Sequence, residues 1–195
     1  MTPEVIIAMI IASMLSNNYP LIECLGTGAV LENERSNKRS VVLGLCTTVV
    51  MLISTLITWP LNKFLLTDVP YLRTLVFVCV VMAVVEVIHL IDRNSVNKFC
   101  RVDFTKFAIN GAVLGLCIEN THSEKLLTAF GLSSGFEFPA VLITTLGVGL
   151  GFTLVLTVFS ALEYRIDYDA VPYSFRGLPI HLLIAGMIVL ALLCF

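Results

Sequence analysis

The sequence predicts an all-α membrane protein with six transmembrane segments, and composition and patterning both support this fold class. Hydrophobic residues make up 57% of the 195 residues, whereas charged residues make up only 13%. A soluble domain carries about 25% charged residues, so this composition is typical of a membrane protein. The mean hydropathy of +0.94 agrees. Only short polar links separate the apolar runs, so we expect one membrane domain over residues 1–195.

The apolar runs set the bounds of the six predicted segments. A transmembrane helix needs about 20 apolar residues. The first run is interrupted and the fourth is too short, so we expect broken or half-length helices there. The predicted segments cover residues 3–31, 41–61, 71–91, 104–118, 139–162 and 178–195.

Polar residues interrupt the first segment at a depth where lipid offers no hydrogen-bond partners. They are the amides Asn17 and Asn18 and the carboxylate Glu23, and Pro20 stands among them as a helix breaker. Such groups persist in a bilayer only where they face protein or a water-lined cavity. The fourth segment carries a similar break, where Asn110 precedes Gly111. These paired breaks are the strongest indication of a functional site.

The two halves of the chain, residues 1–93 and 104–195, show the same order of features. Each half has a broken or short segment followed by two full-length segments. Three crossings per half give the halves opposite orientations, so we expect an inverted repeat. In such folds the interrupted helices meet near the midplane and form the site.

The basic residues predict the orientation of the chain. Links after the first, third and fifth segments carry nine of the twelve, and the opposite side carries three. The nine are Arg35, Lys38, Arg39, Arg93, Lys98, Arg101, Lys106, Arg165 and Arg176, and the three are Lys63, Arg73 and Lys125. The positive-inside rule therefore predicts that both termini lie outside the cytoplasm.

Five residues are candidates for an ion or proton pathway: Asn17, Asn18, Glu23, Glu86 and Asn110. Glu23 either forms a cation or proton site beside the break, or is a hydrated carboxylate near the cytoplasmic interface. Glu86 precedes His89 by three residues, so both share a helix face. They form either a proton relay or a pair buried against a partner chain.

No pattern indicates a catalytic residue or a closed metal site. The six cysteines contain no CxxC pair, so most are expected to be small buried hydrophobes. His122 and His181 are isolated in the sequence, and His181 is expected near the aqueous edge of the last helix. The spacing of Gly111 and Gly115 favours close helix packing. Nucleotide fingerprints and a basic aromatic face for nucleic acid are absent.

Four motifs resemble those of a known family. They are Asn17-Asn18 followed by Leu25-Gly26, Tyr71 to Leu75, Asn110 to Gly115, and Val171-Pro172 followed by Phe175-Arg176-Gly177. With these motifs the chain resembles the Rnf/Nqr family of integral membrane subunits, and within it the RnfA/NqrE branch. The resemblance implies a prokaryotic inner membrane, further Rnf/Nqr-type subunits, and among them an RnfE/NqrD-like partner.

The resemblance also implies an intramembrane [2Fe-2S] cluster, held by one cysteine at each break of two paired subunits. Such a cluster needs four ligands. In this chain those positions align with Gly28 and Gly111, which have no side chain. We therefore expect no cofactor, unless Cys24 and Cys117 substitute as ligands and share the cluster with the partner.

The expected function is a non-catalytic membrane subunit of a redox-driven, ion-translocating electron-transport complex. Two alternatives remain from the residues: a cluster-free transporter module for a cation or solute, and a structural assembly subunit.

Overall fold

The computed structural model describes residues 3–15, 37–66, 69–94, 111–122, 136–167 and 171–192. These residues form six α-helices and three short 3₁₀ turns, and they contain no strand. The predicted all-helical class is therefore confirmed for this part of the chain.

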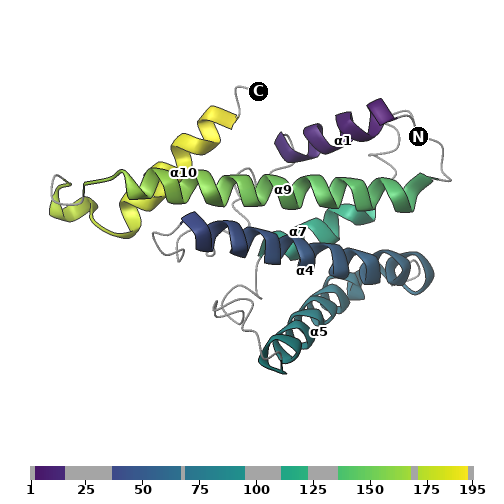
Figure 1. Ribbon diagram of the computed structural model, residues 1–195. Coiled ribbons are helices and arrows are strands. Elements are labelled where there is room, and N and C mark those ends of the chain that lie inside the picture. Colours follow the sequence, from purple (N-terminus) through teal and green to yellow (C-terminus); the bar gives the residue numbers. More distant parts are fainter. Residues whose placement is uncertain are drawn as a thin grey trace.

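Two long antiparallel helices form the centre of the fold (Figure 1). They are α4, Asn37–Phe64, and α9, Glu137–Tyr164, each of 28 residues. Near the start of α4, Gly44 lies against Thr153, while Lys63 at its other end pairs with Glu137 at the start of α9. A helix of this length extends for about 42 Å, comparable to the roughly 40–45 Å of a bilayer with its headgroups.

Hydroxyl side chains are buried between α4 and α9 without breaking either helix. Thr48, Thr58 and Thr145 each donate to a backbone carbonyl four residues earlier, at 2.7–2.8 Å. Because these bonds stay within one helix, the hydroxyls are satisfied in surroundings that offer no water. Threonine therefore adds polar atoms to the interior at little cost.

Alternate glycines of α9 allow close contact on two opposite faces. A Cβ at Gly147 would collide with Ser13, and one at Gly151 would lie 2.6 Å from the carbonyl oxygen of Met14. Gly149 faces the other way, where a Cβ would collide with Thr48. Small residues let helix backbones approach closely in membranes, so α9 packs between α1 and α4.

Four shorter helices surround the central pair. Helix α1, Pro3–Leu15, packs on α9, and α10, Leu178–Leu192, packs on the other end of α9 (Figure 1). Helices α5, Arg73–Asn94, and α7, Gly111–Glu119, pack on α4 and against each other. Side chains of all these helices except α1 share one apolar core, which includes Phe77, Leu116 and Phe152.

The helix bounds differ from the predicted segments by a few residues. The second segment, predicted over 41–61, extends over Asn37–Phe64 because α4 takes in part of the charged link and continues through Pro60. The fifth, predicted over 139–162, becomes Glu137–Tyr164. Among the described residues, two stretches are long and apolar enough to cross a bilayer, Ser40–Phe64 and Glu137–Tyr164.

Candidate functional site

Four of the five predicted pathway residues, Asn17, Asn18, Glu23 and Asn110, lie outside the described residues. So do Pro20 of the first break and two of the cluster-ligand positions considered, Cys24 and Gly28. The structure describes Gly111, Cys117 and Glu86, so the site is described below from the surroundings of these three residues.

The described end of the fourth segment is the nine-residue helix α7, which begins at Gly111. Its length is about 13 Å, too short to cross the hydrocarbon core. Ala112, Val113 and Leu116 are buried where α7 contacts α4 and α5. The structure describes the predicted fourth segment, residues 104–118, only from Gly111 onward, so its half-length character stays a prediction.

A buried polar cluster, the Asn120 junction, joins α7 to both central helices. The Asn120 amide donates to the hydroxyl of Thr55 on α4 and to that of Thr145 on α9, both at 3.3 Å. All three side chains are buried. Asn120 stands in the 3₁₀ turn η2, Asn120–His122, directly after α7. The junction therefore fixes the end of α7 against the α4–α9 interface.

Cys117 lies beside this junction and faces the interior of its own chain. Its side chain is buried and is in hydrogen-bonding contact with Thr58 and Thr55 of α4. This thiol is therefore enclosed between α7 and α4.

Glu86 has a different environment, because it lies on the outward face of α5. Its side chain is exposed, whereas the neighbouring Val84 and Val85 are buried. The side chain of His89 lies outside the described residues, so the predicted pairing of Glu86 with His89 stays a prediction.

A hydrogen-bonded side-chain pair that sequence reasoning missed joins α9 to α10. The Oε1 atom of Glu163 lies 3.1 Å from Nε2 of His181, and Phe159 packs against the imidazole ring. The predicted fifth segment ended at residue 162 and so left Glu163 in the following link; that bound is wrong, because Glu163 lies in α9. His181 is isolated in the sequence, and the structure supplies its partner from another helix. The two residues are 18 positions apart, so only the approach of α10 to α9 brings them together.

Replacing Glu163 with glutamine is expected to lower the stability of the protein by about 1 kcal/mol. The amide keeps the shape but loses the charge-assisted bond to His181, and such bonds are stronger than neutral ones. The midpoint of thermal unfolding in detergent measures this loss.

Glu137→Gln is the matched control for this prediction. It removes the pair with Lys63, whose side chain is 51% exposed, and exposed pairs contribute about 0–1 kcal/mol. A larger loss in the control than in Glu163→Gln would contradict the assignment of the Glu163–His181 pair as the link that holds α10.

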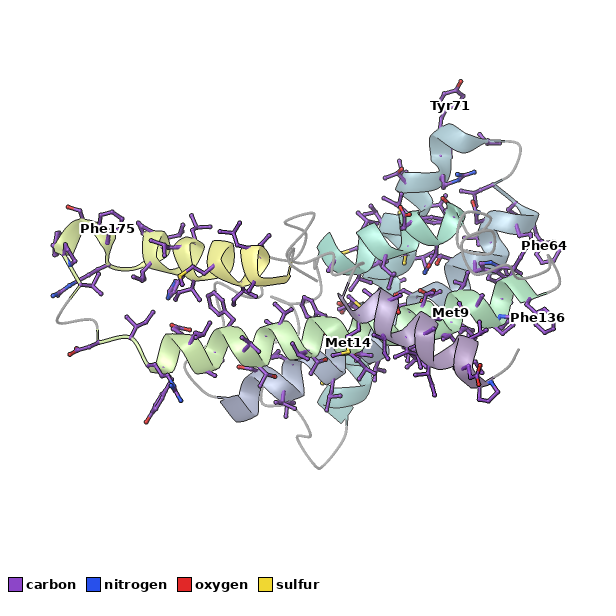
Figure 2. The ribbon with its side chains drawn as sticks, turned by 90° about the horizontal axis from the view of Figure 1, so that it is seen from above. Met9, Met14, Phe64, Tyr71, Phe136 and Phe175 are labelled. Atoms are coloured by element: carbon purple, nitrogen blue, oxygen red, sulfur yellow. The ribbon has the colours of Figure 1, made fainter. Side chains whose placement is uncertain are left out.

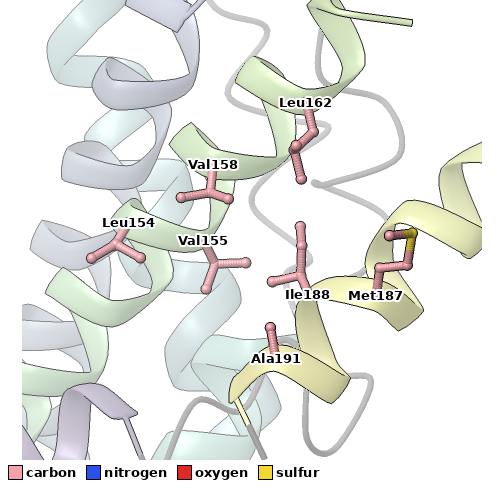
Figure 3. Close-up of a pocket in the computed structure, with 7 residues that line it drawn as sticks. All are labelled: Leu154, Val155, Val158, Leu162, Met187, Ile188 and Ala191. Carbon is pink, nitrogen blue, oxygen red and sulfur yellow. The ribbon is translucent and has the colours of Figure 1, made fainter. Parts of the chain in front are cut away.

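An apolar groove of about 340 Å³ lies between α9 and α10 (Figure 3). Its walls are aliphatic side chains and one methionine, with Leu154, Val158 and Leu162 on α9 and Met187, Ile188 and Ala191 on α10. These side chains offer no group for acid–base or nucleophilic chemistry. Within the described ranges, no three His, Cys, Asp or Glu residues come together as metal ligands.

Comparison with known proteins gives a match over nearly the whole chain. A family model described as "Rnf-Nqr subunit, membrane protein" matches residues 6–195. The subunit designated A in the ion-translocating oxidoreductase complex of Syntrophotalea carbinolica is 30% identical, with 97% of this chain and 95% of the relative covered. The subunit of the same letter in the Na⁺-translocating ferredoxin:NAD⁺ oxidoreductase complex of Acetobacterium woodii is 28% identical, with 97% and 96% covered.

Proposed function

Because the chain belongs to the Rnf-Nqr family of membrane subunits, we propose that it is an RnfA/NqrE-like, non-catalytic subunit of a redox-driven, ion-translocating electron-transport complex. The match over residues 6–195 carries this proposal. An RnfE/NqrD-like subunit is its proposed partner in a prokaryotic inner membrane, together with other Rnf/Nqr-type subunits.

Two short repeats in the sequence support the proposed inverted repeat. Val-Pro-Tyr occurs at 69–71 and again at 171–173, and each copy leads through a 3₁₀ turn into the helix of the third predicted segment of its half, α5 or α10. Gly-Ala-Val-Leu stands at 28–31 and at 111–114, where the second copy opens α7. Both pairs occupy corresponding places in the two halves.

Packing between the helices supports the same architecture. The helices of the second predicted segment in each half, α4 and α9, form the central antiparallel pair. The helix of the third predicted segment, α5 or α10, packs on the long helix of its own half. The short helices cross over: α1 of the first half packs on α9, and α7 of the second half packs on α4. This exchange is expected if two halves are related by a pseudo-twofold axis in the membrane plane.

Exposed aromatic side chains at both ends of the central pair support its position across a bilayer. Phe64, Tyr71 and Phe136 lie towards one end and Phe175 lies at the other (Figure 2). Tyr71 is 94% exposed, and Tyr173, in the turn with Phe175, is 89% exposed. Aromatic residues are enriched at both membrane–water interfaces, so the ends fit the two headgroup regions.

The course of the terminal helices supports the proposed outward termini. Helix α1 runs parallel to α9, since Ser13 faces Gly147 and Met14 faces Gly151, and α10 leaves the end of α9 that carries Glu163. The N-terminal end of α1 and the C-terminal end of α10 therefore both lie towards the end of α9 that carries Glu137. That end carries few basic residues, as expected for the side outside the cytoplasm.

Of the positions implied by the family or considered as substitutes, the structure describes Gly111 and Cys117, and neither supports a [2Fe-2S] cluster shared between two subunits. Gly111, at the start of α7, has no side chain to bind iron. Cys117 is enclosed between α7 and α4 of its own chain, away from any surface that a partner could share. We therefore propose a subunit that lacks the cluster ligands of its family and retains a structural or ion-gating role around Asn17, Asn18, Glu23 and Asn110.

Cys117→Ser is expected to leave the iron content, the visible absorbance and the electron-transfer rate of the purified complex unchanged. Cys79→Ser, at an exposed position of α5, serves as the matched thiol control. Loss of iron and absorbance in the Cys117 variant alone would contradict the proposal, because it would identify that thiol as a ligand.

A transporter module for a cation or solute is the second candidate function, and glycine at both ligand positions favours it. It predicts ion or solute flux in vesicles that contain this chain alone. Co-purification with flavin-carrying and ferredoxin-like subunits, without such flux, supports the electron-transport complex instead.

A further inference from the structure

Helix α5 has two faces of different character. Phe77, Val81 and Val84 form the buried face against α4 and α7. The opposite face is exposed and consists of Leu75, Cys79, Met82, Glu86 and Leu90, which we call the α5 outer face. The steps of three and four residues align these side chains along one side of the helix.

Glu86 stands well inside this apolar face. It follows the start of α5 at Arg73 by about 20 Å and precedes the end at Asn94 by about 12 Å. Its outward neighbours Met82 and Leu90 are exposed apolar side chains. Within the described part of the chain, which leaves out the side chain of His89, no hydrogen bond or ion pair of Glu86 is found.

A carboxylate at this depth is costly when it faces lipid. Insertion scales give roughly 2.5–3.5 kcal/mol for an aspartate or a basic residue at the centre of a spanning helix, and intramembrane charges nearly always face protein or water. Glutamate is too short to reach the headgroup region from this position. The exposed carboxylate therefore indicates that another macromolecule covers the α5 outer face.

The shape of the face suits a helix. Cys79 and Ala83 are exposed small residues one turn apart, and small residues at this spacing permit close helix–helix approach. The larger Leu75 and Leu90 lie before and after these two small residues along α5.

We propose that the α5 outer face binds a transmembrane helix of another subunit, which presents a lysine or arginine side chain to Glu86. Charge complementarity selects this partner, since a cation neutralises the carboxylate and removes its cost in the bilayer. The inference rests on the proposed function, because it requires the chain to act within a multi-subunit membrane complex.

The test compares Glu86→Leu and Glu86→Lys with the wild-type chain, in complexes purified through a tag on another subunit. Each variant is expected to lower the amount of this chain retained by roughly tenfold or more, because removing one partner leaves the other charge buried and unpaired. The isolated Glu86→Leu chain is expected to be as stable as the wild type, or more stable. Leu190→Lys, on an exposed position of α10, is the control for a charge on another lipid-facing helix.

Photo-crosslinking identifies what covers the face. A photoreactive amino acid at Met82 is expected to react with a different subunit, and one at Leu146, which is exposed on α9, is the reference. Crosslinks from Met82 only to lipid, or only to a second copy of this chain, overturn the proposal. So does full retention of the Glu86 variants with loss of ion transport, which assigns Glu86 to the ion pathway. If the wild-type chain itself fails to co-purify with redox subunits, the proposed function fails first.

Discussion

Replacing Gly147 with leucine is expected to separate α1 from α9 and to destabilise the protein by about 3 kcal/mol or more. A Cβ at this position would collide with Ser13 and would lie 2.9 Å from the backbone carbonyl of Ile10. The backbone of α1 cannot rotate aside as a flexible side chain can, so the whole helix must move. The thermal unfolding midpoint in detergent and the yield of monodisperse protein measure the effect.

Gly186→Leu is the matched control for this substitution. Gly186 is also a glycine of an apolar helix, but a Cβ there would meet nothing within 4 Å. The control is therefore expected to unfold at nearly the wild-type temperature. Equal losses in both variants would mean that helix propensity or insertion, and not the α1–α9 contact, accounts for the defect.

The sequence was sufficient to predict the helices but not their contacts. The long apolar runs predicted α4 and α9 to within a few residues of their ends, because length and composition determine which segments suit a bilayer. The three glycines at 147, 149 and 151 were visible in the sequence. Their assignment to two opposite helix contacts required the structure, because a glycine carries no pattern that identifies its neighbour.

Two polar groupings were missed for the same reason. Glu163 and His181 lie in different helices, and their pairing depends on where α10 meets α9. Asn120 was placed in the polar link after the fourth segment, yet it is buried against Thr55 and Thr145. An asparagine in a polar link is ordinarily solvated, so nothing in the sequence indicated that η2 packs against both α4 and α9.

The candidate site was predicted mainly from interruptions in hydrophobicity and from the resemblance to a family. A short helix begins at Gly111, beside the second of the two predicted breaks. Cys117 lies six residues further along, and its burial against α4 follows from tertiary packing that spacing alone could not reveal. The pathway residues of the first segment stay predictions, since they lie outside the described residues.

Replacing Asn120 with alanine is expected to cost about 2 kcal/mol, because it removes two buried hydrogen bonds and leaves a small cavity. This loss of stability is expected to be shared among the three side chains of the Asn120 junction, because both hydrogen bonds involve Asn120. Thr55→Val and Thr145→Val remove the acceptors while keeping the side-chain shape, and each is expected to cost about 1 kcal/mol. Thermal unfolding midpoints of the single and double variants measure these terms.

The double-mutant cycle tests whether the three side chains act together. If the hydrogen bonds are the cause, Thr55→Val and Thr145→Val should lower the free energy of unfolding much less in the Asn120→Ala background than in the wild type. In that background the amide that donates to these two hydroxyls is absent. Thr157→Val is the control, since Thr157 donates to the carbonyl of Thr153 in its own helix and makes no hydrogen bond to the junction residues. Its effect should add independently. Strictly additive losses for all three threonines would contradict the junction. They would leave α7 fixed by its apolar contacts with α4 and α5 alone.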